Sequence, residues 1–193
     1  MRSLVVATTN RGKVRELALL LGPSWQLLTA LDFPHLPEVV EDRDTFRGNA
    51  ALKAHAFARA LGRWTLADDS GLCVDALGGR PGVQSARYAA TDAKRMARLL
   101  AELEGVPDAR RTARFECALC LAGPSGEERF TEGRCEGWIG HAPRGSHGFG
   151  YDPLFEVGGG RTLAELEEAE KAARSHRGAA FRAMVPELER LVR

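Results

Sequence analysis

The beginning of the chain limits the fold most strongly, because a short apolar run passes directly into a helical repeat. Residues 3–8 form an apolar segment that is typical of a buried strand. Apolar side chains then recur at helical spacing over residues 10–21, and Gly22-Pro23 ends this repeat. A strand, a tight turn and a helix in this order favour an α/β fold.

The rest of the sequence continues this alternation. We expect further strands at residues 25–29, 64–67, 72–74, 112–122 and 128–135, the last two as an antiparallel pair. We expect further helices at residues 45–61, 91–103, 162–173 and 175–192, the last bent or restarted at Pro186. The pattern predicts an α/β fold with a mixed sheet and flanking helices. A length of 193 residues suits a single domain, residues 1–193, with two lobes.

The charge balance argues against a general affinity for polyanions. The chain has 27 Lys and Arg residues against 26 Asp and Glu residues, a formal charge of +1. Nucleic acids and anionic membranes attract strongly basic surfaces, so we expect neither as a partner. The N-terminal apolar run is too short for a signal peptide, and no apolar run approaches the length of a membrane span. We therefore expect a cytoplasmic protein.

The four cysteines do not suggest a metal knuckle. Cys117 and Cys120 have its spacing, but they lie in an expected strand. Side chains three residues apart in a strand point to opposite faces, so this pair cannot chelate one ion. We interpret them as small core side chains, and a reducing compartment gives a chain of this size little use for disulfides.

The first candidate for a functional site is the turn between the first strand and the first helix. Its residues are Thr8, Thr9, Asn10, Arg11, Gly12 and Lys13. Free N–H groups at a helix start bind phosphate oxygens, and Lys13 in the first turn can reach the same anion. This predicts a polyphosphate cradle. The alternative is an N-cap formed by Thr9 or Asn10, with Lys13 solvated.

The second candidate is a set of acidic residues. Asp68 and Asp69 follow an apolar strand directly, and Glu41 lies in the preceding acidic loop. Carboxylates at a sheet edge suit Mg²⁺, and a carboxylate beside the ion can take a proton from an attacking water. The alternative is that Asp68 and Asp69 only form a turn.

Two further stretches carry candidate base-binding side chains. The glycine-rich segment 145–153 contains two aromatic rings and one carboxylate, a combination that suits the stacking of a base. A plain loop with one anchoring aromatic is the alternative. Near the C-terminus, Lys171 precedes Ser175-His176-Arg177, in which Ser175 has the character of an N-cap and His176 that of a surface residue.

Six stretches in this order resemble the inosine/xanthosine triphosphate pyrophosphatase family. They are Thr8-Thr9-Asn10-Arg11-Gly12-Lys13 with Glu16; Thr45-Phe46 with Asn49-Ala50 and Lys53-Ala54; Ala67-Asp68-Asp69-Ser70-Gly71-Leu72 with Asp75-Ala76-Leu77; Pro81-Gly82 with Ser85-Ala86-Arg87-Tyr88; Gly148-Phe149-Gly150-Tyr151-Asp152-Pro153; and Glu170-Lys171 with Ser175-His176-Arg177. Each is weak alone, but together they extend from residue 8 to residue 177.

The resemblance implies a homodimer of two-lobed α/β subunits with a central nucleotide cleft and a dependence on Mg²⁺. It implies hydrolysis of ITP, dITP and XTP to the monophosphate and pyrophosphate. It assigns the metal to Glu41 and Asp69, and the activation of water to Asp69. The implied substrate-binding residues are Thr8, Thr9, Asn10, Arg11, Gly12, Lys13, Lys53, Ser70, Phe149, Gly150, Tyr151, Asp152, Lys171, His176 and Arg177.

The chain departs from the family pattern at three positions. These are Gly48, where glutamate is frequent; Gln84, where an aromatic residue is common; and Val40, where a second acid can precede Glu41. Three other functions compete with hydrolysis of non-standard purine nucleotides. They are a nucleotide sensor of the same fold, a pyrophosphatase for modified pyrimidine nucleotides, and an RNA-binding module that stacks bases on Phe149 and Tyr151.

Overall fold

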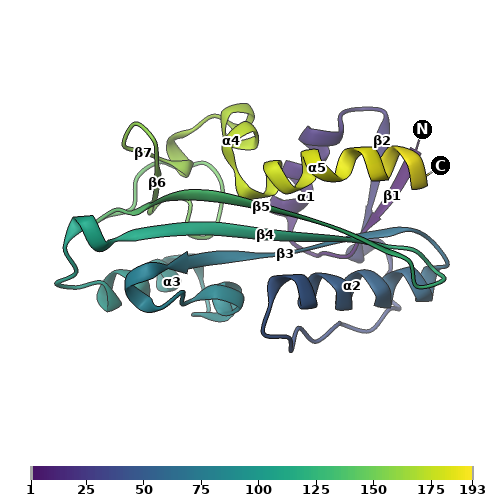
Figure 1. Cartoon of the computed structure of the whole chain (residues 1–193), viewed down its shortest axis with the longest axis horizontal. Coiled ribbons are helices and arrows are strands. Elements are labelled where there is room, and N and C mark those ends of the chain that lie inside the picture. Colours follow the sequence, from purple (N-terminus) through teal and green to yellow (C-terminus); the bar gives the residue numbers. More distant parts are fainter. Residues whose placement is uncertain (1, 193) are drawn as a thin grey trace. The chain divides into compact units, whose positions relative to one another are not determined.

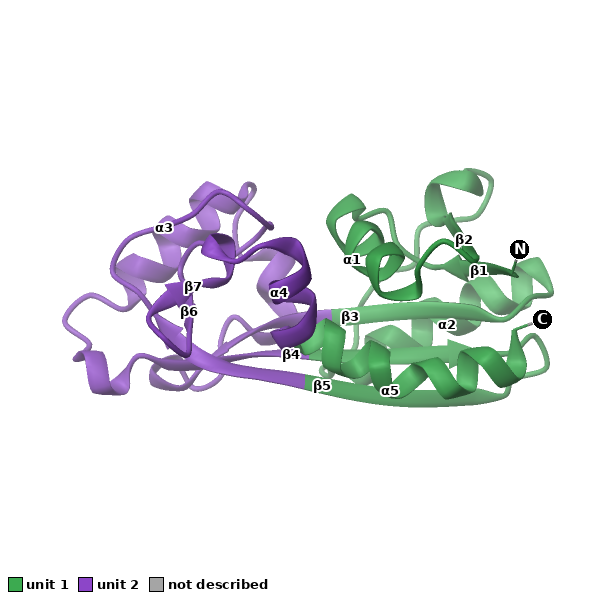
Figure 2. Ribbon diagram, turned by 90° about the horizontal axis from the view of Figure 1, so that it is seen from above, with its two compact units in different colours: residues 1–69, 117–133, 176–193 green, residues 70–116, 134–175 purple. Residues whose placement is uncertain are grey.

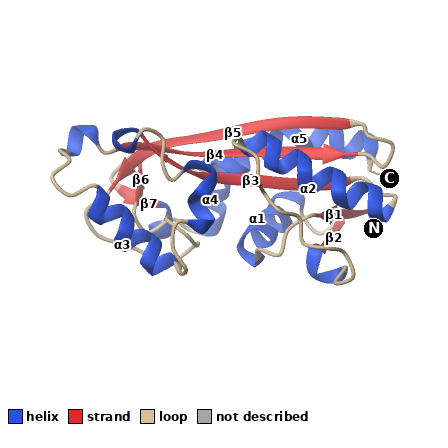
Figure 3. Cartoon of the chain, turned by 90° about the horizontal axis from the view of Figure 1, so that it is seen from below, coloured by secondary structure: helices blue, strands red, loops and turns tan. Residues whose placement is uncertain are grey.

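The computed structural model describes residues 2–192, and in this part of the chain seven strands form one mixed sheet with flanking helices (Figure 3). The strands are β1 Arg2–Val6, β2 Trp25–Thr29, β3 Thr65–Val74, β4 Thr112–Ala122, β5 Glu128–Ile139, β6 Phe155–Val157 and β7 Arg161–Thr162. The helices are α1 Arg11–Leu21, α2 Phe46–Leu61, α3 Asp92–Glu102, α4 Glu168–Arg174 and α5 His176–Leu191. The order in the sheet is β2-β1-β3-β4-β5-β6-β7, so the predicted α/β class is confirmed.

The chain divides into two compact units, coloured separately in Figure 2. Unit 1 comprises Met1–Asp69, Cys117–Gly133 and His176–Arg193, and unit 2 comprises Ser70–Glu116 and Arg134–Ser175. The chain therefore passes between the units four times, and three of these passages lie within β3, β4 and β5. The prediction that residues 1–193 behave as a single domain stays a prediction.

Unit 1 is layered, with helices on both faces of its part of the sheet (Figure 1). β1 pairs in parallel with β2 and with β3, where Val6 faces Leu66. Alternate residues of β1 enter different clusters: Leu4 packs with α1 and α5, whereas Val5 packs with α2. Parallel strands buried on both faces need such continuous apolar runs.

β4 follows the same alternation in unit 1. Cys117 joins the cluster with α5, and Cys120 joins the cluster with α2. The prediction that the two thiols point to opposite faces is confirmed. All four cysteines are free and buried.

Unit 2 has its own apolar core around α3 and the short strands. Leu72 and Val74 of β3, Phe115 of β4 and Phe155 of β6 pack in one cluster, in which the two phenylalanine ring centroids are 4.7 Å apart. β6 pairs antiparallel with β5 and β7. No helix among residues 2–192 is both long and apolar enough to cross a membrane.

Three predicted boundaries were wrong. β3 does not end at Ala67 but runs on to Val74, so Asp68 and Asp69 are strand residues instead of turn residues. β5 extends to Ile139, and α4 starts only at Glu168 because the preceding residues form β7 and a short 3₁₀ turn. α5 continues through Pro186, where the buried side chains Met184 and Leu188 hold the helix against the sheet.

Candidate functional site

The candidate site in unit 1 begins where β3 continues beyond its neighbour β1. Just after the paired residues Val6 and Leu66, the Ala7 N–H donates a hydrogen bond of 2.8 Å to the Leu66 carbonyl. Two residues further along β3, the Asp68 carbonyl accepts a hydrogen bond of 2.7 Å from Lys53 Nζ of α2. The Lys53 ammonium group thus binds the backbone edge of β3 just beyond the end of β1.

Asp68 and Asp69 point to opposite faces of the sheet because they are neighbours in a strand. Asp68 is fully buried on the face of α1 and α5, where it receives hydrogen bonds from Lys13 Nζ, from Arg177 Nε at 2.9 Å and from the Cys117 thiol at 3.2 Å. Burial alone would raise the pKa of Asp68, but Arg177 and Lys13 hold this pKa well below its usual value. Asp68 therefore stays ionised to lower pH than an ordinary aspartate and anchors Lys13 and Arg177.

Asp69 lies on the other face, towards α2. Its Oδ2 accepts a hydrogen bond of 3.0 Å from Asn49 Nδ2, and its Oδ1 is 3.9 Å from Lys53 Nζ. Burial is the strongest influence on this carboxyl group and raises its pKa above the usual value, although Lys53 and Lys13 oppose that rise. The two neighbouring aspartates thus have pKa values shifted in opposite directions.

The turn between β1 and α1 contains the N-cap that the alternative for residues 8–13 predicted, while the polyphosphate cradle stays a prediction. Asn10 is the N-cap of α1, since its side chain accepts a hydrogen bond of 3.1 Å from the Lys13 N–H. The Lys13 side chain is not solvated, because it is only 14% exposed and pairs with Asp68. The alternative with a solvated Lys13 was therefore wrong.

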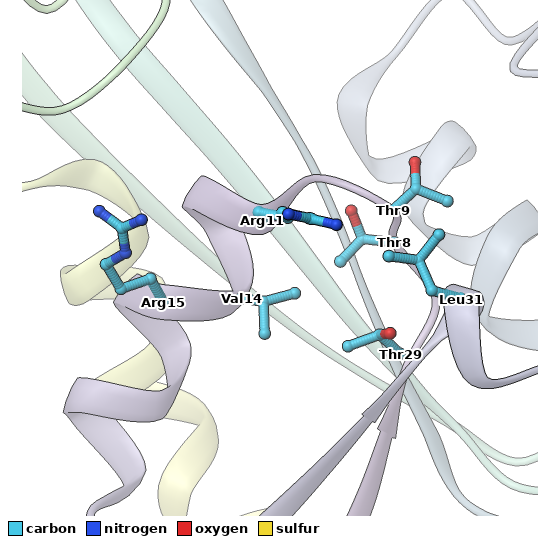
Figure 4. A pocket seen from close by; sticks show the side chains of 7 residues that line it. All are labelled: Thr8, Thr9, Arg11, Val14, Arg15, Thr29 and Leu31. Carbon is cyan, nitrogen blue, oxygen red and sulfur yellow. The ribbon is translucent and has the colours of Figure 1, made fainter.

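A pocket of about 200 Å³ opens beside this turn (Figure 4). It is lined by Thr8, Thr9, Arg11, Val14, Arg15, Thr29 and Leu31. The predicted cradle residues Thr8, Thr9 and Arg11 thus border one pocket, whereas Lys13 is directed to Asp68.

Glu41 completes the acidic group of unit 1. Its carboxylate pairs with Lys53 Nζ, the same ammonium group that lies near Asp69. One cation therefore sits between two carboxylates, which shows that this place favours positive charge. Hard oxygen donors of this kind are the ligands that Mg²⁺ takes from proteins, so Glu41 and Asp69 fit this ion.

The predicted base-side residues of unit 2 form a second group, around the turn 148–152. Asp152 Oδ2 accepts hydrogen bonds from the Phe149 N–H at 2.8 Å and from Lys171 Nζ at 2.7 Å. Lys171 Nζ also lies 4.9 Å from the centroid of the Phe149 ring. A Cβ at Gly148 would lie 2.2 Å from Asp152 Oδ2, so only glycine fits beside this ion pair. This buried ion pair holds the turn in place, and neither base stacking nor the alternative of a loop with one anchoring aromatic is decided by it.

Tyr151 supports the same turn from within unit 2. Its hydroxyl donates a hydrogen bond of 3.0 Å to the Ser85 carbonyl, and its ring is buried. Desolvation raises the pKa of this phenol far above its usual value. Tyr151 therefore anchors the loop through a neutral hydroxyl group.

The structure divides the predicted substrate residues between the units. Residues 8–13, Glu41, Lys53, Asp69, His176 and Arg177 belong to unit 1, whereas Ser70, Lys171 and the turn 149–152 belong to unit 2. Arg177 lies with the acidic group, because it donates to Asp68 and to Glu16 of α1. The roles assigned to these residues stay predictions.

Sequence reasoning missed several supporting side chains. Asn49 and Glu16 lie in the matched stretches but received no role, although they bind Asp69 and Arg177. Asp92, at the start of α3, accepts a hydrogen bond of 2.8 Å from the Gly150 N–H and so holds the base-side turn. Asp92 follows the N-cap Thr91, which signalled only a helix start.

The structure gives a steric reason for the departure from the family pattern at Gly48. A Cβ at Gly48 would lie 2.9 Å from the Arg43 Cβ and 3.0 Å from the Thr45 hydroxyl oxygen. Arg43 is fixed there because its N–H donates a hydrogen bond of 2.9 Å to Asn49 Oδ1. The loop before α2 thus fills the space that a longer side chain at position 48 would need.

Comparisons with known proteins agree with these motifs. A dITP/XTP pyrophosphatase from Geobacillus kaustophilus is 50% identical, over 100% of this chain and 97% of the relative. A dITP/XTP pyrophosphatase from Streptomyces coelicolor is 48% identical over the full length of both chains. The structure of a HAM1 protein from Coxiella burnetii matches 98% of this chain and 100% of its own, with a TM-score of 0.88 and 40% identity.

The matching region extends over both units. The sequence profile of the Ham1 family matches residues 4–187, which include both aspartates of β3 and both base-side stretches. This coverage and the full-length relatives show that the chain belongs to the Ham1 family.

Proposed function

We propose that this protein hydrolyses non-standard purine nucleoside triphosphates, namely ITP, dITP and XTP, to the monophosphate and pyrophosphate. The names of full-length relatives at about half identity support this substrate class. The proposal rests mainly on the two neighbouring aspartates of β3. Arg177 and Lys13 lower the pKa of Asp68, whereas burial raises the pKa of Asp69. This combination suits binding of a phosphate chain next to a base that can accept a proton.

In this proposal the triphosphate binds to the turn 8–13 and to Lys53. Backbone N–H groups at the start of α1 point towards a bound anion, and the helix dipole favours negative charge there. Lys13 and Lys53 lie beside the β3 carboxylates and would neutralise charge that develops on the phosphate oxygens.

Asp69 is the proposed general base. Its raised pKa lies nearer to neutrality than that of an ordinary aspartate, which makes proton acceptance from water more favourable. Asn49 fixes the orientation of the carboxylate through Oδ2. Water then attacks the α-phosphorus, and pyrophosphate leaves.

Glu41 and Asp69 are the residues that would hold Mg²⁺. When bound, Mg²⁺ supplies charge neutralisation at the phosphate oxygens. Lys53 lies near both carboxylates, and its hydrogen bond to the Asp68 carbonyl would keep its ammonium group at the site.

Recognition of the base is assigned to the ring of Phe149, to the turn 150–152 and to the donors Lys171, His176 and Arg177. Hypoxanthine and xanthine carry a carbonyl at position six, where adenine carries an amino group. Donors that face the carbonyl would face another donor in adenine, and each unpaired buried polar group costs about 1–3 kcal/mol. This predicts a preference for ITP over ATP.

The test is pyrophosphate release from ITP, dITP, XTP, GTP, ATP and a modified pyrimidine triphosphate, each with and without Mg²⁺. We expect release from ITP, dITP and XTP only when Mg²⁺ is present. Binding of ITP without release would instead support a nucleotide sensor. Preference for the pyrimidine substrate would support a pyrimidine pyrophosphatase, and either result would overturn the proposal.

We also propose a homodimer in the cytoplasm. The dimer follows from the family resemblance, and four free thiols agree with a reducing compartment. Light scattering of the purified protein tests the dimer, because a monomeric mass at micromolar concentration would contradict it. Filter binding with RNA at low salt tests the expected absence of a nucleic-acid partner.

A further inference from the structure

Three side chains with different metal-binding atoms converge in unit 1, on the face of the sheet that α2 covers. They are His55 of α2, Cys120 of β4 and Glu128 at the start of β5. Their donor atoms all lie within 4.8 Å of one another, and His55 Nε2 is 2.9 Å from Glu128 Oε2. Within residues 2–192, no other three His, Cys, Asp or Glu side chains come together in this way.

The fold explains why these residues meet. Cys120 points towards α2 because it alternates with Cys117, which points towards α5. The turn after β4 returns the chain to Glu128, since the Gly123 N–H donates a hydrogen bond of 2.8 Å to the Glu127 carbonyl. Helix α2 and the consecutive strands β4 and β5 thus hold the three side chains together through regular structure.

Burial changes in steps across the group. The Cys120 residue is fully buried, the His55 side chain is 20% exposed and the Glu128 side chain is 45% exposed. The group is therefore closed on the side of the core and accessible from solvent at Glu128. Such a site admits an ion from one side and leaves a position for water.

The donor set differs from that of Glu41 and Asp69. A thiolate, an imidazole and a carboxylate with one water form a tetrahedral shell typical of Zn²⁺, whereas Mg²⁺ prefers oxygen ligands alone. We propose that His55, Cys120 and Glu128 form a binding site for Zn²⁺ or a similar late transition-metal ion. This proposal stands on the donor atoms and does not depend on the proposed function.

The required movement is small. Bonds of about 2.0–2.3 Å at tetrahedral angles place ligand atoms roughly 3.3–3.7 Å apart. No separation exceeds 4.8 Å, so the widest must shrink by at most about 1.5 Å, and the 2.9 Å contact of His55 with Glu128 must widen by roughly 0.5 Å. His55 and Glu128 can supply this movement because both are partly exposed, while Cys120 stays fixed in β4.

Proton and charge balance can be followed at each ligand. Burial raises the pKa of the Cys120 thiol to about 12, so metal binding must release the thiol proton to solvent. His55 binds as the neutral ring, and the charges of Glu128 and the thiolate together balance a divalent ion. The positive charge of Arg47 lowers the pKa of Cys120 and so opposes part of the effect of burial. The Arg47 guanidinium lies 3.7 Å from the centroid of the Phe130 ring.

The test uses the full-length protein after removal of bound metals with a chelator. Titration with Zn²⁺ in a weak buffer is expected to show one high-affinity site and the release of a proton. Titration with Co²⁺ is expected to give the thiolate-to-metal absorption of a tetrahedral site. Absence of that absorption in the wild-type protein would overturn the proposal.

Variants identify the ligands. Cys120→Ser is expected to lose the thiolate absorption, whereas Cys135→Ser, at a buried cysteine of unit 2, is expected to keep it. His55→Gln and Glu128→Gln change partly exposed side chains and are expected to weaken Zn²⁺ binding by about tenfold or more. Wild-type affinity in these two variants would refute the site even if Cys120→Ser failed to fold.

Discussion

The charged groups of the two units are organised differently. In unit 1, Asp68 and Asp69 lie among Lys13, Lys53 and Arg177, so that one buried carboxylate is shared by several cations. In unit 2, Asp152 and Lys171 form one buried pair beside an aromatic ring. A dense network suits a substrate part with high charge, and a single pair with a ring suits a flat, neutral part. The comparison predicts that the charged network of unit 1 determines turnover and that the base-side turn of unit 2 contributes to selectivity.

The largest effect is expected from Asp69→Asn. This substitution preserves the shape and the contact with Asn49 but removes the proton acceptor, so turnover of ITP should fall about a thousandfold, or about 4 kcal/mol. The measurement is pyrophosphate release at saturating ITP and Mg²⁺. Full turnover in a folded variant would refute the assigned role of Asp69.

The next largest effect concerns stability and separates Asp68 from its neighbour. Asp68→Asn removes the buried charge that Lys13 and Arg177 share and leaves Arg177 only its pair with Glu16 among the ion pairs described, which should cost about 3 kcal/mol or more in the free energy of unfolding. Urea unfolding measures this loss. Asp42→Asn is the control, because its side chain is 63% exposed and its loss should cost under about 0.5 kcal/mol.

A moderate effect is expected from Phe149→Leu in unit 2. Loss of the ring removes base stacking, which is worth about 1–3 kcal/mol, so KM for ITP should rise roughly tenfold with kcat little changed. Steady-state kinetics measures both constants. Phe130→Leu is the matched control, since this ring in unit 1 packs under Arg47 and should leave KM unchanged. A fall in kcat alone for Phe149→Leu would contradict the proposed role of this ring in binding the base.

A smaller effect is expected from Asp92→Ala. Asp92 holds the Gly150 N–H, so its removal should loosen the base-side turn and raise KM for ITP about fivefold, or roughly 1 kcal/mol. Asp108→Ala is the control, because Asp108 also lies in unit 2 and its exposed side chain pairs with exposed His141. Equal KM values in the two variants would exclude a positioning role for Asp92.

The smallest effect is a displacement along the pH axis. The raised pKa of Asp69 means that a proton-accepting carboxylate is lost as the pH falls through a value above 3.8, so kcat/KM should decline there. The lowered pKa of Asp68 means that its stabilising charge is present above 3.8 and lost only at lower pH, as the pH falls through its folded value. Activity should therefore disappear on acidification before the fold does, and a pH–rate profile beside a circular-dichroism titration measures the order.

Much of the fold could be predicted because its signals are local. The helical repeat after the first strand, the caps Asn10, Thr45 and Thr91, and the glycine turn after β4 all act within a few residues. The continuation of β3 through Asp68 and Asp69 could not be predicted in this way. Two adjacent carboxylates are unfavourable in a buried strand unless distant cations compensate, and Arg177 lies 109 residues away in sequence.

The candidate site was predicted in its residues more than in its contacts. Lys13 and both aspartates were named from their residue types and Lys53 from the family resemblance, and the structure brings all four into one charged region, while their roles stay predictions. The sequence contained no sign that Lys13 pairs with Asp68 instead of projecting into solvent, because this pair joins positions 55 residues apart. The supporting contacts of Asn49, Glu16 and Asp92 could not be predicted for the same reason, because each joins positions that are distant in sequence.

The alternating side-chain directions along β3 also limit which mutations this protein can tolerate. Loss or gain of a single residue between Thr65 and Asp68 would reverse the side-chain direction of both carboxylates. The Asp68 carboxylate, which now neutralises Arg177, would turn towards α2. The Asp69 carboxylate, the proposed proton acceptor, would turn towards α5. The length of this segment is therefore fixed, so insertions and deletions should be confined to the turns outside it.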